Sequence, residues 1–95
     1  MTSSERSLLR SFAMAMQPTT NIGKNGINDM LIRQVDEQLE CRELVKISVL
    51  KNSAGSAEDY AQEVAEKVNG EVVQVIGNKI TVYRKSKRSG IRHLI

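Results

Sequence analysis

The sequence predicts an α+β fold of two layers, in which three helices pack on a four-stranded mixed β-sheet. Three observations predict this class. Apolar residues recur at helical spacing in three segments, they alternate with polar residues in a strand candidate, and glycine, proline and asparagine separate the segments. The predicted order is helix, strand, helix, strand, helix, strand, strand. Strands joined through helices usually pair in parallel, and a hairpin pairs antiparallel. The prediction leaves open whether some of the helices pack on the other face of the sheet.

The first helix is predicted over residues 4–16, with Ser3 or Ser4 as its N-cap and Pro18 ending the pattern. Its apolar face comprises Leu8, Leu9, Phe12, Ala13 and Met16. The β-branched residues of segment 19–22 then favour a short strand.

A tight turn, Gly23 to Gly26, leads into a second helix over about residues 28–40. Its apolar face comprises Leu31, Ile32, Val35 and Leu39. The clearest strand spans residues 44–50, where apolar and polar residues alternate.

The third helix begins with the capping-box-like segment 56–59, and Gly70 is its expected stop. Its buried face is expected to comprise Tyr60, Ala61, Val64, Ala65 and Val68. Strands over 71–76 and 79–83 follow, and the two residues 77–78 between them suit a hairpin.

The length of 95 residues predicts a single domain, 1–95, and 40% apolar residues are enough for one modest core. No apolar run reaches the roughly 18 residues of a membrane span, and the N-terminus lacks the pattern of a secretory signal. The only cysteine, Cys41, favours a reducing, cytoplasmic setting.

The charges are unevenly distributed along the chain. Residues 72–95 contain no acid, and their cations are Lys79, Arg84, Lys85, Lys87, Arg88 and Arg92. Eight acids lie between Asp36 and Glu66. This pattern predicts one basic end, with residues 84–95 as a basic tail that either attracts a polyanion or serves only as a solvated segment.

The turn formed by Gly23, Lys24, Asn25 and Gly26 is a candidate phosphate site. Glycine permits close backbone approach, the start of a helix favours an anion, and Lys24 adds a charge. A GxxG loop contacts RNA in this way in KH domains. The alternative is a purely structural turn, because short glycine turns are common.

The sequence offers no catalytic or metal-binding set. His93 and Cys41 are single and far apart, whereas zinc needs three or four protein ligands. Tyr83 would either pack in the core or stack on a base. No cofactor and no small-molecule substrate are therefore expected.

Three blocks of the sequence resemble the bacterial YhbY family, the free-standing form of the CRM domain. The blocks are Pro18 with Asn21–Ile27, then Glu43–Lys46 after a helix with Val35-Asp36 and Leu39-Glu40, and Val73–Gly77 with Ile80, Val82–Arg84 and Ser86-Lys87. The chain departs from the family pattern near Met14 and at Arg42, where relatives often have histidines.

The resemblance implies a fold similar to the C-terminal domain of bacterial translation initiation factor three. It also implies binding to ribosomal RNA in precursors of the large subunit, with the GxxG loop touching RNA. The sequence hypothesis is therefore a monomeric RNA-binding protein that assists ribosome assembly. Its RNA-binding candidates are Gly23, Lys24, Asn25, Gly26, Arg10, Arg84, Lys85, Lys87 and Arg88. The rival hypothesis is a protein-interaction module whose acidic helices dock a basic ribosomal protein or other partner.

Overall fold

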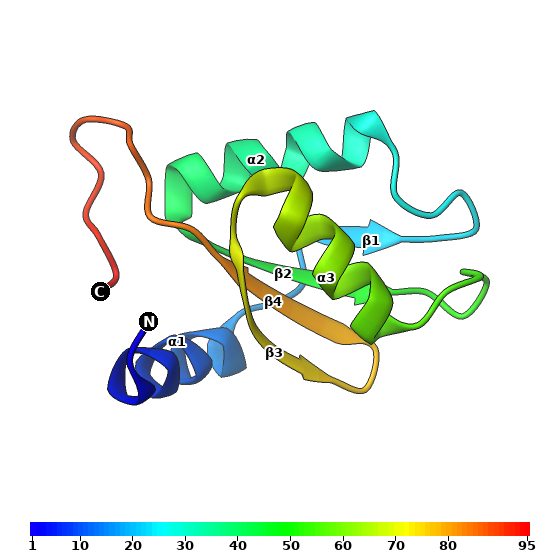
Figure 1. The fold of residues 1–95 in the computed structure, drawn as a ribbon, viewed down its shortest axis with the longest axis horizontal. Helices are drawn as coiled ribbons and strands as arrows, with labels where there is room; N and C mark the ends of the chain where they lie inside the picture. Colours follow the sequence, from blue (N-terminus) through cyan, green and yellow to red (C-terminus); the bar gives the residue numbers. More distant parts are fainter.

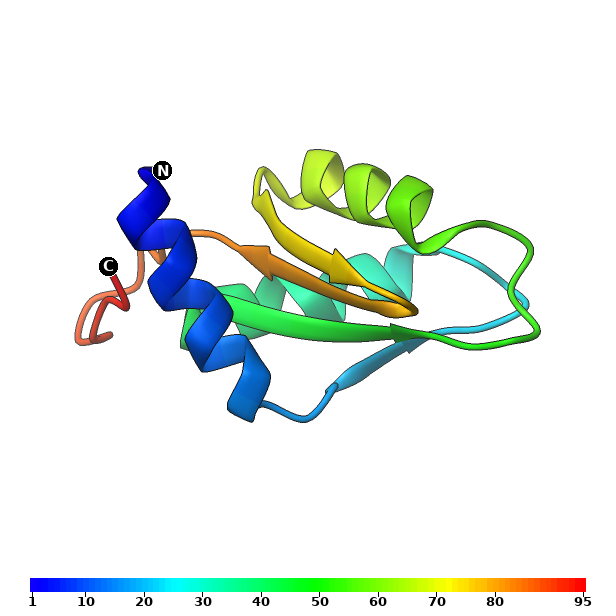
Figure 2. The same ribbon diagram turned by 90° about the horizontal axis from the view of Figure 1, so that it is seen from below.

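A β-sheet lies at the centre of the molecule and carries helices on both faces (Figures 1 and 2). The structure is a computed structural model that describes residues 1–95. Its elements are α1 (Ser3–Ala15), β1 (Thr20–Ile22), α2 (Asp29–Arg42), β2 (Leu44–Val49), α3 (Ala57–Val68), β3 (Glu71–Ile76) and β4 (Lys79–Tyr83). The predicted fold class and element order are confirmed. No helix has the combination of length and apolar character needed to cross a bilayer.

The strands lie in the order β1-β2-β4-β3. β1 pairs in parallel with β2, with Thr20 opposite Ile47, and β4 pairs antiparallel with both β2 and β3. Although α3 connects β2 to β3 directly, these two strands are not neighbours, because β4 lies between them. The last strand of the chain therefore completes the middle of the sheet.

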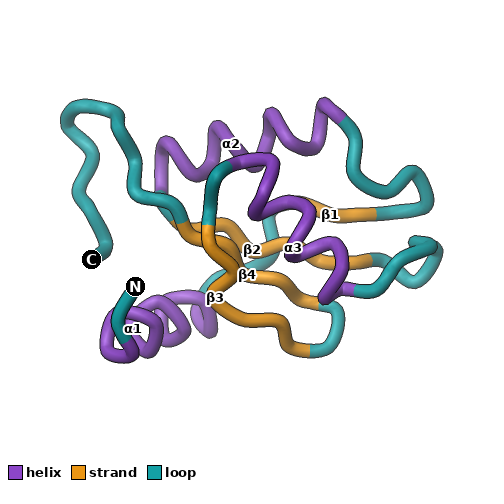
Figure 3. The backbone as a smooth tube through the Cα atoms, in the orientation of Figure 1, coloured by secondary structure: helices purple, strands orange, loops and turns teal.

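Alternation along β2 divides the core into two parts. Val45, Ile47 and Val49 belong to a cluster of 13 buried residues between the sheet, α2 and α3. Leu44 points the other way, into a smaller cluster with residues of α1. Of the three helices, α1 alone packs on the second face, which the sequence prediction had left open (Figure 2; Figure 3 shows the same arrangement by element type).

The first helix differs in detail from the sequence prediction. Thr2, not Ser3 or Ser4, is the N-cap, and its hydroxyl accepts a hydrogen bond from the Glu5 amide at 3.1 Å. Within α1 only Leu9 and Ala13 are buried, while Leu8 and Phe12 remain 43% and 39% exposed. The reason is that α1 packs on the sheet without a second helix beside it, so only a narrow stripe is covered.

The second helix extends to Arg42, two residues beyond its predicted end, and stops at Glu43. Glu43 has a left-handed backbone with φ of 66°, and its N–H donates to the Leu39 carbonyl. A left-handed backbone costs about 1–2 kcal/mol in a residue with a side chain. The side chain of Glu43 is also fully buried, so this residue needs strong compensating contacts.

The third helix also ends on a left-handed residue, Asn69, with φ of 56°. The predicted stop, Gly70, follows it directly, and its amide donates to the Ala65 carbonyl at 2.8 Å. A Cβ atom at Gly70 would lie 3.1 Å from the Tyr83 carbonyl oxygen and 3.0 Å from Val82 Cγ1. Glycine is therefore favoured there by close packing against β4, and Asn69 provides the left-handed turn.

The carboxylate of Glu43 holds the C-terminal segment against the domain. It accepts hydrogen bonds from the amides of Ser86 at 2.6 Å and Leu94 at 2.8 Å, and it lies 2.6 Å from His93 Nδ1. Burial alone would raise the pKa of Glu43, but these hydrogen bonds outweigh burial and lower the pKa below its ordinary value. Residues 84–95 therefore return across the end of α2, and Leu94 and Ile95 pack against the α1 cluster.

Two arginines of the C-terminal segment form ion pairs with α2. The Arg84 guanidinium donates to Asp36 at 2.6 Å and to Glu40 at 3.0 Å, and Arg88 pairs with Glu37 at 3.3 Å. Charges that are separated along the sequence are thus adjacent in the fold. The expectation of an open basic end is corrected accordingly, because Arg84 and Arg88 are not free cations.

Replacing Glu43 by glutamine should lower the free energy of unfolding by roughly 2–4 kcal/mol near neutral pH, because a buried charged acceptor is lost. Since the folded-state pKa of Glu43 lies below its ordinary value of 4.5, the carboxylate stabilises the wild type above about pH 4.5. That contribution is lost as the pH falls through the folded-state pKa. The difference between the two proteins should therefore shrink in acid, which urea denaturation at several pH values would measure.

Glu37→Gln is the matched control, because the Glu37 side chain is 65% exposed and pairs only with Arg88 and Cys41. Its loss should stay below about 1 kcal/mol. Equal losses for the two variants would contradict the central role of Glu43.

Candidate nucleic-acid interface

The loop between β1 and α2 is a closed turn with a free tip. The Gly26 amide donates to the Gly23 carbonyl at 3.0 Å. Lys24 and Asn25 form the exposed tip, and their own backbone amides donate to no protein acceptor. The tip therefore offers two backbone donors beside one ammonium group.

The two glycines of this loop are present for different reasons. Gly26 has φ of +63°, a conformation that strains any residue with a side chain. Gly23 has no such φ, and a Cβ atom there would lie 3.7 Å from both Asn52 Oδ1 and Leu50 Cδ1, which is ordinary contact. The backbone conformation thus favours glycine at position 26, whereas position 23 has room for a side chain.

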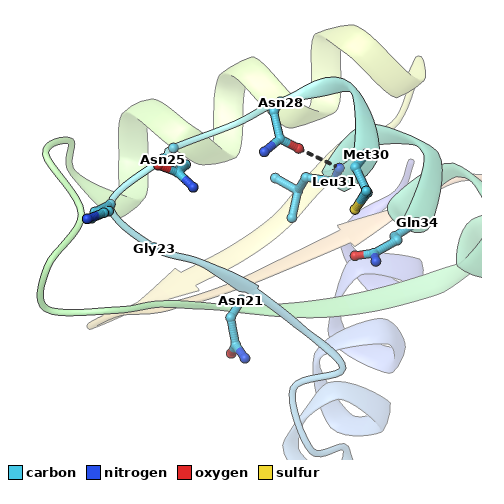
Figure 4. A pocket seen from close by; sticks show the side chains of 9 residues that line it. Asn21, Gly23, Asn25, Asn28, Met30, Leu31 and Gln34 are labelled. Carbon is cyan, nitrogen blue, oxygen red and sulfur yellow. Dashed lines mark hydrogen bonds between the residues drawn. The ribbon is translucent and has the colours of Figure 1, made fainter.

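A hollow of about 230 Å³ lies between this loop, β1 and the start of α2 (Figure 4). Besides the loop itself, its lining comprises Asn21, Asn28, Met30, Leu31 and Gln34. No carboxylate lines it. The amide side chains can donate and accept hydrogen bonds, which suits sugar hydroxyls and base edges.

The start of α2 is a weaker anion site than the sequence indicates. Asn28 caps the helix, and its Oδ1 accepts from the Leu31 amide at 2.9 Å (Figure 4). Asp29 in the first turn adds a negative charge. Asn28 therefore occupies one of the free amides of the helix, and the charge of Asp29 repels an anion at the helix end. Lys24 and the amides of the turn remain the main anion-binding groups.

A second lysine, which the sequence prediction missed, lies in the neighbouring loop. β1 and β2 pair in parallel, with Ile22 opposite Val49. Both strands are followed two residues later by a Lys-Asn pair, Lys24-Asn25 and Lys51-Asn52. Their loops lie together at one end of the molecule (Figures 1 and 2), and neither lysine forms an ion pair. The repeated pair after two parallel strands was the signal that could have revealed Lys51.

The remaining predicted cations do not join the loop. Figures 1 and 2 place the Gly23–Gly26 loop and the C-terminal segment at opposite ends of the longest axis, whose extent is 36 Å. Lys85 and Lys87 are exposed on that segment, and Arg10 is exposed on α1. The hypothesis of one continuous surface across the loop and the tail is therefore corrected to two separate basic regions.

Of the three aromatic residues, only Phe12 differs from the sequence prediction. Tyr83 is buried beneath α1, which is the packing alternative. Tyr60 packs partly against the main core, and its hydroxyl accepts from the Gly55 amide at 2.9 Å. Phe12 was expected in the core but is 39% exposed, which makes it the most exposed aromatic ring of the chain.

Comparisons with known proteins agree with this fold and sequence pattern. Residues 1–84 match the model of the CRS1 / YhbY (CRM) domain, and the chain belongs to this family. The resemblance to the YhbY family is thereby confirmed.

Two relatives and one solved structure are similar over most of the chain. The probable RNA-binding protein YqeI of Bacillus subtilis is 39% identical over 89 residues, which cover 94% of this chain and 93% of that protein. The probable RNA-binding protein MJ0652 of Methanocaldococcus jannaschii is 34% identical over 88% of this chain and 63% of that protein. The solution structure of the hypothetical protein SAV1595 from Staphylococcus aureus has a TM-score of 0.77 and 42% identity, covering 94% of this chain and 93% of that one.

Alanine substitution should destabilise the protein to different extents at the two loop glycines. Gly26→Ala should lower the free energy of unfolding by about 1 kcal/mol, because alanine is strained at positive φ. Gly23→Ala should change it by less than about 0.5 kcal/mol, because the added methyl group fits. Urea denaturation measures both, and equal losses would contradict the different roles assigned to the two positions.

Proposed function

We propose that this chain is an RNA-binding protein whose primary contact is the loop of Gly23, Lys24, Asn25 and Gly26. The observation that carries the proposal is the exposed tip, where two unoccupied backbone amides adjoin an unpaired lysine. Lys24 binds phosphate, the amides hold the sugar-phosphate backbone, and the missing side chain at Gly23 permits close approach. Lys51 adds a second cation from the neighbouring loop.

Several findings support RNA as the ligand. The relatives from Bacillus subtilis and Methanocaldococcus jannaschii are both named as RNA-binding proteins. The finer proposal, ribosomal RNA in precursors of the large subunit, follows from the resemblance to the free-standing YhbY family. The protein would assist assembly as a cytoplasmic monomer and carry out no catalytic step itself. Arg10, Lys85 and Lys87, which are exposed, would add non-specific affinity.

The rival proposal, docking of a basic protein on acidic helices, has less support. Asp36, Glu37 and Glu40 of α2 are already paired with Arg84 and Arg88. The acids available to a partner are therefore mainly those of α3.

Charge reversal at Lys24 should weaken RNA binding by roughly tenfold or more, because one phosphate contact becomes a repulsion. Fluorescence anisotropy with a labelled fragment of large-subunit ribosomal RNA measures this effect for Lys24→Glu. The slope of log affinity against log salt should also fall by about 0.7–0.9, the value of one phosphate contact.

Lys67→Glu is the matched control, because Lys67 is exposed in the last turn of α3 and forms no ion pair. It makes the same change in net charge away from the loop and should weaken binding much less. Wild-type affinity for Lys24→Glu would show that the loop is not the RNA site.

Sedimentation of cell lysate through a sucrose gradient tests the finer proposal. The wild-type protein should migrate with large-subunit precursors and not with mature ribosomes, while Lys24→Glu should remain in the light fractions. If the wild type stays in the light fractions at low salt, the ribosomal assignment is wrong even where RNA binding holds.

A further inference from the structure

A second hollow, of about 590 Å³, lies at the end of the molecule opposite the Gly23–Gly26 loop. It is bounded by α1, the C-terminal end of α2 and the returning C-terminal segment. Its lining includes Phe12, Arg42, Arg92 and His93, together with Cys41, Ile91 and Leu94, and contains no carboxylate. The function proposed above makes no use of this groove, which we call the tail groove.

The positive charge of the tail groove comes from arginines that have no ion-pair partner within the protein. Arg84 and Arg88 engage three carboxylates of α2. Arg42 and Arg92, both exposed, form no ion pair. Two guanidinium groups without an ion-pair partner beside one hollow favour an anionic ligand over a neutral or cationic one.

One wall of the tail groove is held in place from beneath. The Glu43 carboxylate binds His93 Nδ1 at 2.6 Å and the Leu94 amide at 2.8 Å. This contact fixes the orientation of the imidazole, so that Nε2 is directed away from Glu43. The side chain of His93 is 40% exposed, and its Nε2 forms no hydrogen bond within the protein.

The opposite wall provides an aromatic surface. Phe12 is 39% exposed in α1, whereas Tyr83 is buried and Tyr60 is partly buried against the main core. An accessible ring beside arginines is the combination that holds an unpaired base, because the base stacks on the ring and the adjoining phosphates bind the guanidinium groups.

We propose that the tail groove binds an unpaired nucleotide of the RNA, with its base against Phe12 and its phosphates on Arg42 and Arg92. This inference rests on the proposed function and deepens it, since it adds a single-stranded contact at the end opposite the loop. Because the molecule is 36 Å long, the two sites hold two separate segments of one RNA. The chain then recognises an RNA that presents both segments, and not a uniform duplex.

The test compares affinities for a labelled single-stranded RNA oligonucleotide of mixed sequence and for an RNA duplex of matched length. Phe12→Leu removes the ring but keeps an apolar side chain, and Arg42→Gln and Arg92→Gln each remove one cation. Each variant should weaken single-strand binding roughly fivefold or more. Lys67→Gln, with the same charge loss as the arginine variants, should have a much smaller effect, and duplex binding should be insensitive to Phe12→Leu.

Amide spectra of the ¹⁵N-labelled wild-type protein locate the contacts directly. The oligonucleotide should shift resonances of residues 23–28 and, as a separate group, those of residues 41–42 and 91–94. Shifts confined to the loop, or groove variants no weaker than Lys67→Gln, would overturn the tail-groove assignment while Lys24→Glu still reports the loop site. Absence of any wild-type RNA binding would overturn both proposals. Groove shifts induced by an acidic peptide but not by RNA would identify a protein site instead.

Discussion

The buried carboxylate of Glu43 is the contact on which the C-terminal half of the architecture depends. Glu43 ends α2 in a left-handed conformation, and its main-chain carbonyl accepts a hydrogen bond from the Arg84 amide. Its side chain binds Ser86, His93 and Leu94. A carboxylate with no exposed surface is unfavourable unless it is fully hydrogen-bonded, so the C-terminal segment must dock for this helix end to be stable. Helix termination, the position of the segment and the shape of the tail groove are therefore consequences of one side chain.

Docking of the C-terminal segment also determines which charges remain for a ligand. Arg84 contacts both Asp36 and the Val68 carbonyl, and so joins the middle of α2 to the C-terminal end of α3. Once Asp36, Glu37 and Glu40 are paired in this way, unpaired cations remain at both ends of the molecule, Lys24 and Lys51 at the loop end and Arg42 and Arg92 beside the tail groove. The net charge of +3 is small, and its effect depends on this internal pairing more than on the total.

Features encoded in short segments were predictable from the sequence, and those that depend on distant partners were not. Apolar periodicity identified the three helices and β2, β-branched residues and turn signals identified the other strands, and the glycines of 23–26 identified the loop. The position of Phe12 was not predictable, because periodicity cannot tell how much of an apolar stripe a neighbour covers. The docking of residues 84–95 depends on Glu43, whose bonds to Ser86 and Leu94 span 43 and 51 residues of chain. Lys51 could have been found, given the parallel pairing of the two strands that precede the Lys-Asn pairs.

The position of β4 between β2 and β3 has a consequence for how the protein is made. β4 is the last strand to be synthesised, yet both β2 and β3 pair with it, and β3 pairs with nothing else. During translation the sheet therefore stays open, with the backbone hydrogen-bonding groups along one edge of β2 unpaired, until residue 83 has emerged. The sheet can be completed only after β4 has left the ribosome, through contacts between distant residues that form slowly. A nascent chain stalled before β4 would consequently be a target for chaperones and proteases.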